Sequence, residues 1–188
     1  MKENGKLCAA VGGIAWAHIL LLLDFNLGSL NVLPDWLGYV LILRALPALA
    51  EERESAALLR PLGLLLTAWE AFLWTAKLLG FSPEPYILGL VAATVSLYFH
   101  FQLLTELAAA AEAHGCPERK RLLVLRTVRT VMICVLALPL DYGDSQAAAW
   151  LFIALGLVVA VWICRVLFSL RASLRGREDG GAEAGEAP

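Results

Sequence analysis

The chain has 188 residues, of which 60% are hydrophobic and 17% charged, and its mean hydropathy is +0.71. Soluble domains are about 45–50% apolar and about 25% charged, so this composition excludes an ordinary soluble fold and indicates a chain surrounded by lipid. The net charge of −2 leaves no basic face, so we expect no nucleic-acid partner.

Apolar segments follow one another along the chain and predict membrane spans. A helix needs about 20 residues to cross the hydrocarbon core, and continuous runs without period-two alternation favour helices over a membrane barrel. We therefore expect an all-α polytopic transmembrane bundle of about six spans, at residues 7–23, 34–50, 60–81, 85–110, 121–140 and 147–170. The second and fifth segments reach the required length only if arginines lie in or near the core.

The first segment also resembles a signal peptide, because Lys2 and Lys6 precede an apolar run. A cleavage site would follow the apolar core, whereas here the small residues precede the leucines. We expect the segment to stay as a membrane span.

Cations alternate between the connections. Residues 24–33, 80–85 and 141–146 contain no Lys or Arg, whereas residues 51–60 and 115–121 and both ends of the chain carry them. Cytoplasmic flanks collect Lys and Arg, so this pattern predicts that both termini are cytoplasmic. The tail at 176–188 has no large apolar residue, and we expect it to be disordered in the cytoplasm. The remainder, 1–175, is predicted to form a single transmembrane domain.

Local signals mark helix ends and the state of the cysteines. Pro34 with Asp35, and Pro117 with Glu118, are typical of helix starts, and Gly115 is typical of a helix end. The four cysteines share no metal-binding spacing, and we expect them to be reduced, with no disulfide framework, metal site or cofactor.

Glu70 is the most unusual residue, because it lies near the middle of the third span. An unpaired charge there costs about 2.5–3.5 kcal/mol. Thr67, Glu70 and Lys77, together with Trp74, recur at helical spacing and predict one stripe that faces the bundle interior. The stripe indicates either a proton or ion site or a neutral glutamate held by packing.

Arg44 is the natural partner of Glu70. Folding the second and third spans about the 51–60 turn brings Arg44 within a turn of Glu70, which would satisfy both charges. Alternatively, Pro47 ends the membrane part early and Arg44 reaches toward cytoplasmic headgroups, which is the reading we favour.

Two histidines, His18 and His100, lie deep in different spans. Neither has a His or Cys at metal-ligand spacing. A histidine in a span can relay protons, but a lone one more often makes a hydrogen bond across a helix interface, and we expect packing roles.

A cluster of charges is predicted at the cytoplasmic side, from Glu106, Arg126 and Arg129. A cross-helix ion pair or a lipid-phosphate contact would explain it. At the outer side, acids that include Asp35 either form a vestibule that attracts cations or, as we prefer, only cap helices and solubilise loops.

The segment Asn31 to Ile42, NVLPDWLGYVLI, resembles a pattern in small uncharacterised multi-pass membrane proteins of Firmicutes-type bacteria. The resemblance implies a location in the bacterial plasma (inner) membrane and makes the Pro34–Tyr39 turn a family feature. It implies no catalytic residue.

Three functions are compatible with these observations. The first is a small transporter or channel-like protein, for which a homo-oligomer is one option. The second is a non-catalytic scaffold or regulatory subunit with a membrane-protein partner. The third and weakest is an enzyme that modifies lipids within the membrane. No phosphate-binding glycine loop, nucleophile elbow or zinc-protease motif is present, and no catalytic residue is predicted.

Overall fold

The computed structural model describes residues 2–22, 26–27, 30–31, 34–81, 86–137 and 146–184. Within these residues the chain forms six α-helices, which confirms the predicted helical bundle. The helices are α1 (Lys2–Leu22), α2 (Asp35–Glu52), α3 (Leu59–Leu78), α4 (Tyr86–Ala113), α5 (Glu118–Ala137) and α6 (Gln146–Ala184). A 3₁₀ turn, η1 (Glu54–Leu58), joins α2 to α3.

Two short strands lie between α1 and α2. They are β1 (Asn26–Leu27) and β2 (Leu30–Asn31), which pair antiparallel in the register Asn26 to Asn31 and Leu27 to Leu30.

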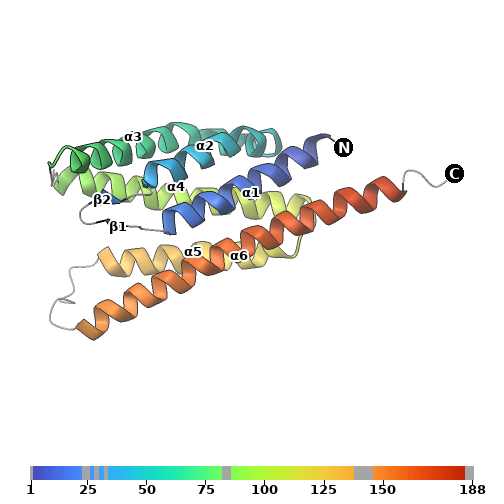
Figure 1. The fold of residues 1–188 in the computed structure, drawn as a ribbon. Coiled ribbons are helices and arrows are strands. Elements are labelled where there is room, and N and C mark those ends of the chain that lie inside the picture. The colour runs from blue at the N-terminus through green and yellow to red at the C-terminus, as the bar shows by residue number, and fades with distance from the viewer. Residues whose placement is uncertain are drawn as a thin grey trace.

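The helices lie roughly side by side along one long axis, as Figure 1 shows. Each helix contacts the next one in the chain, and α6 closes the ring by packing along α1. Figure 1 places the N- and C-termini at the same end of the bundle. We call this the terminal end, and we call the opposite end, where α1 finishes and α2 begins, the cavity end.

Local chemistry accounts for where the helices begin and end. Pro34 is the N-cap of α2 with an extended ψ of 134°, and Asp35 provides the negative charge that the first turn favours. Gly115 follows α4 at φ +63°, a conformation that costs glycine little, and Cys116 N–H donates to the Ala111 carbonyl at 2.7 Å. α2 continues through Pro47, so that proline does not end the helix.

The core follows from the apolar faces that the ring turns inward. Ile14, Ile42, Phe99 and Leu167 are fully buried together with leucines from α2 to α5. Gly38 permits the close approach of α1 and α2, since an added Cβ there would lie 2.7 Å from Leu21 Cγ and 3.1 Å from the Ala17 carbonyl oxygen.

The outer surface is apolar where lipid would contact it. Large apolar side chains are exposed along the first half of α4 and of α6, including Tyr86, Ile87, Trp150 and Leu151. In the described residues, four helical segments are long and apolar enough to cross a membrane, namely Gly5–Leu22, Glu54–Leu78, Tyr86–Ala113 and Trp150–Arg177. α2 and α5 do not meet that standard because each carries several charged side chains.

α6 runs to Ala184, into the segment 176–188 for which the sequence predicts disorder. The disorder of that tail in solution stays a prediction. The other acids of the predicted outer side, Asp24, Glu84, Asp141 and Asp144, lie outside the described residues.

Candidate functional site: a polar cavity inside the helix ring

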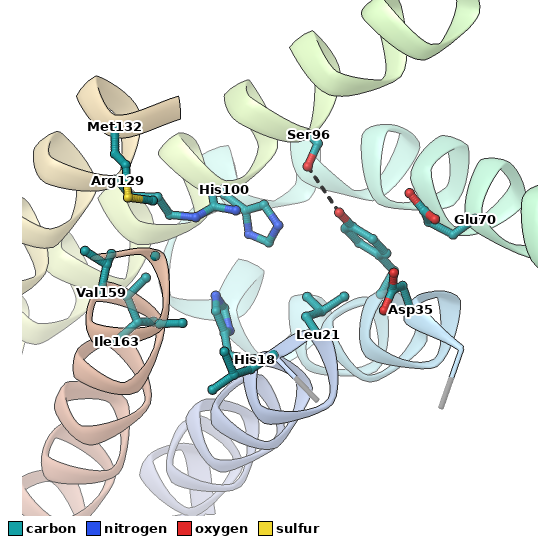
Figure 2. Close-up of a pocket in the computed structure, with 14 residues that line it drawn as sticks. His18, Leu21, Asp35, Glu70, Ser96, His100, Arg129, Met132, Val159 and Ile163 are labelled. Carbon is teal, nitrogen blue, oxygen red and sulfur yellow. Dashed lines mark hydrogen bonds between the residues drawn. The ribbon is translucent and has the colours of Figure 1, made fainter. Parts of the chain in front are cut away.

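The helices line a partly open cavity of about 270 Å³ toward the cavity end of the bundle. Every helix from α1 to α6 contributes to its lining, which Figure 2 shows. One side is apolar and comes mainly from α6, whose Gly156 and Ala160 leave space. The other sides are polar and carry His18, Asp35, Tyr39, Glu70, Ser96, His100 and Arg129.

The two histidines face one another across the cavity. His18 on α1 and His100 on α4 have ring centroids 5.6 Å apart, and both are buried, with 9% and 3% of their surface exposed. His18 Nδ1 donates to the Ile14 carbonyl at 2.9 Å, so this contact does not involve Nε2. Within the described residues, neither His18 Nε2 nor His100 Nδ1 has a hydrogen-bond partner. The predicted hydrogen bond across a helix interface is therefore not formed.

Arg129 enters the same cavity from α5. Figure 2 shows its guanidinium extending toward the His100 ring. The group is buried, and it has no carboxylate partner among the described residues. A buried guanidinium without a carboxylate is costly, because it gives up water without gaining a counter-charge.

Acidic side chains occupy another part of the wall. Glu70 on α3 and Asp35 at the start of α2 both line the cavity, and their charges repel one another. Tyr39 lines the same cavity, and the charges of Glu70, Asp35 and Arg129 all act on it. Its hydroxyl shares a hydrogen bond with Ser96 Oγ at 3.2 Å.

The stripe predicted on the third span, Thr67, Glu70, Trp74 and Lys77, only partly faces the interior of the bundle. Glu70 lines the cavity, and Trp74 packs edge-on against Trp36 with ring centroids 6.5 Å apart. Thr67 donates its hydroxyl proton to the Gly63 carbonyl of its own helix at 2.7 Å, and Lys77 is exposed.

Arg44 does not pair with Glu70. Arg44 is exposed, and the charges that act on Glu70 are those of Asp35 and Lys77. The reason lies in the face of α2: Tyr39, Ile42 and Leu46 point into the core at helical spacing, which turns Arg44 outward. The alternative in which Arg44 reaches headgroups stays a prediction.

The predicted charge cluster of Glu106, Arg126 and Arg129 is divided in the structure. Glu106 accepts a hydrogen bond from Gln102 at 2.6 Å and lies 3.5 Å from Arg53 Nε. Arg126 donates to Thr105 Oγ1 at 3.1 Å and lies 4.5 Å above the Phe101 ring. Since α4 and α5 run antiparallel, one further turn along α5 brings Arg129 opposite residues 96–100, inside the cavity.

Sequence reasoning missed the roles of Tyr39, Ser96 and Asp35. Tyr39 lies one turn after Asp35 on α2, so the shared face was visible in the sequence, but Ser96 is an ordinary residue in an apolar run. Asp35 was expected to cap its helix or to join an outer vestibule, and it lines the cavity as well as lying in the first turn of α2.

Metal-ligand geometry is not found in the part of the chain that the structure describes, where no three His, Cys, Asp or Glu side chains gather. The four cysteines are free. The cavity can instead hold water, protons or a small polar solute, because its walls present both donors and acceptors.

No family model, curated protein or solved structure matches this chain. The resemblance of Asn31–Ile42 to Firmicutes membrane proteins therefore stays a prediction.

Proposed function

We propose that the protein is a small membrane transporter that moves a polar solute through the cavity at the centre of its helix ring. The observation that carries this proposal is the cavity itself, which has ionisable side chains from five helices on its wall, and in which Arg129 and Glu70 form no ion pair within the described residues. Ionisable groups inside a membrane domain are costly and usually mark a pathway or a binding site.

In this proposal α2 and α5 also cross the membrane, which gives six spans with both termini in the cytoplasm of a bacterial cell. The charged side chains that make these two helices poor spans by composition are partly accommodated by the ring. Asp35 and Arg129 face the cavity, and the Arg126 side chain packs against α4, where it donates to Thr105. Such a helix can sit in a membrane when its neighbours and a hydrated cavity cover its polar groups.

Transport requires that water-borne molecules reach the cavity from each side of the membrane in turn. The test is a Ser96→Cys variant in a full-length background whose native cysteines are replaced by serine. Membrane-impermeant thiol reagents are applied to oriented vesicles from one side and then from the other. We expect Ser96→Cys to be labelled from both sides, since Ser96 lines the cavity.

Two matched variants make the labelling interpretable. Thr94→Cys lies on the same helix but on its exposed face, so it should stay unlabelled in the bilayer. Gly156→Phe should block labelling at Ser96→Cys by filling the cavity, and it should fold, because an added Cβ at Gly156 meets no atom within 4 Å. Labelling of Ser96→Cys from neither side would overturn the transport proposal and favour a scaffold or regulatory subunit.

A further inference from the structure

The wall of the cavity separates positive from negative charge. Arg129 lies on the side of the two histidines, and Glu70 and Asp35 lie on the opposite side, as Figure 2 shows. Tyr39 also lines the cavity, and the charges of Arg129, Glu70 and Asp35 all act on it. A solute that carries a single charge would satisfy only one side of this arrangement.

The positive side is built to receive an anion. The Arg129 guanidinium is buried without a carboxylate partner among the described residues, and a planar guanidinium suits a carboxylate through two parallel N–H donors. Beside it, the imidazoles of His18 and His100 each leave one buried ring nitrogen without a partner in the described structure. These atoms are aimed into the cavity, where a ligand or ordered water can meet them.

The negative side is built to receive a cation. Glu70 has no hydrogen bond within the described structure, and its nearest charges are the repelling Asp35 and the attracting Lys77, which is itself exposed. An ammonium group between Glu70 and Asp35 would relieve their repulsion. The volume of about 270 Å³ lies below the usual range of drug-sized sites, about 300–1,000 Å³, so the solute is small.

We propose that the transported solute is a small zwitterion of the linear aminocarboxylate class, with its carboxylate on Arg129 and its ammonium on Glu70. This inference rests on the proposed transport function. Because Arg129 and Glu70 lie on opposite sides of the cavity in Figure 2, the charges of the solute are separated by several bonds, and its methylenes lie against the apolar wall of α6.

The probe is 5-aminopentanoate, and two analogues each lack one of its charges. Pentanoate lacks the ammonium, and pentylamine lacks the carboxylate. Isothermal titration calorimetry of the full-length protein in detergent should show 5-aminopentanoate binding at least about tenfold more tightly than either analogue. Glycine, whose charges lie close together, should bind more weakly than 5-aminopentanoate.

Variants at the two sides separate recognition from folding. Arg129→Gln should remove the advantage of 5-aminopentanoate over pentylamine, and Glu70→Gln should remove its advantage over pentanoate. Arg126→Gln, one turn away and outside the cavity, should change neither ratio. If Arg129→Gln does not fold, Arg129→Lys provides a second test, because it keeps the charge but loses the paired donors.

Three results would overturn the inference. They are no binding of 5-aminopentanoate, equal binding of pentanoate, and equal binding of pentylamine. Labelling of Ser96→Cys from both sides without aminocarboxylate binding would reject the solute class and leave transport standing. Absence of that labelling would reject transport itself.

Discussion

The terminal end and the cavity end of the bundle treat their polar groups in opposite ways. At the terminal end, ion pairs join Lys6 to Glu51 at 2.9 Å and Arg119 to Glu112 at 3.0 Å, and Glu118 accepts hydrogen bonds from Ser169 and Ser173. In the cavity, Arg129 and Glu70 have no such partner within the described structure. The comparison indicates that the terminal end uses its charges for stability, whereas the cavity keeps its charges for a solute.

Arg53→Met should give the largest loss of stability at the terminal end. Glu106 is 3% exposed and lies 3.5 Å from Arg53 Nε, so removing the cation leaves a buried carboxylate held only by Gln102. We expect the free energy of unfolding to fall by about 2–3 kcal/mol in detergent denaturation. A fall below about 0.5 kcal/mol would show that this pair does not hold the helices together.

Glu118→Gln should give a smaller loss, of about 1–2 kcal/mol at neutral pH. Burial raises the pKa of Glu118, but the hydroxyls of Ser169 and Ser173 outweigh it, so the pKa lies below its usual value. A lowered pKa in the folded state contributes stability above the unfolded pKa of about 4.3, and that stability is lost as pH falls through the folded pKa.

The difference between wild type and Glu118→Gln should therefore shrink as the pH falls below about 4. Thermal melts over a pH series measure this, and Glu112→Gln, whose carboxylate is half-exposed, is the matched control. A difference that grows toward acid pH would contradict the assignment.

Lys6→Met should give the smallest loss at the terminal end, under about 1 kcal/mol. Lys6 and Glu51 are each about half exposed, and exposed pairs are weakened by water and salt. Melts at low and high salt should converge. A loss above about 2 kcal/mol would mean that Lys6 acts through other contacts, and would weaken the ranking of the terminal pairs.

His100→Phe extends the comparison into the cavity, where we expect no loss of stability beyond about 0.5 kcal/mol. His100 packs edge-on against Phe99, with ring centroids 5.4 Å apart, and Phe preserves this contact while removing an unpartnered nitrogen. Binding of 5-aminopentanoate should weaken even so. A large loss of stability would mean that His100 serves to stabilise the fold.

The helices could be predicted from the sequence because local chemistry determines them. Apolar runs, Pro34 and Gly115 indicate where α2 begins and where α4 ends. The arrangement around the cavity could not be predicted, since His18 and His100 meet only when α6 closes the ring against α1. No spacing of residues in the sequence indicates that α6 packs against α1.

Two groupings of charged residues that the sequence suggested are not formed, for geometric reasons. The pair of Arg44 and Glu70, which was the less favoured alternative, is absent because Arg44 lies on the outer face of α2, as the spacing of Tyr39, Ile42 and Leu46 indicates. Arg126 and Arg129 were grouped because they lie one turn apart. Because α4 and α5 pack antiparallel, Arg126 lies beside Phe101 and Thr105, whereas Arg129, one turn further along α5, lies in the cavity.

The most direct test of the contrast between the two ends is the free energy of unfolding of Arg129→Met, measured beside Arg126→Met without added solute. We predict that Arg129→Met is more stable than wild type by about 1–3 kcal/mol, since it removes a buried charge that has no partner. Arg126→Met should be less stable by about 1 kcal/mol, since it loses the hydrogen bond to Thr105 and the contact with Phe101. If Arg129→Met is instead less stable than wild type, Arg129 supports the fold, and the cavity is not reserved for a solute.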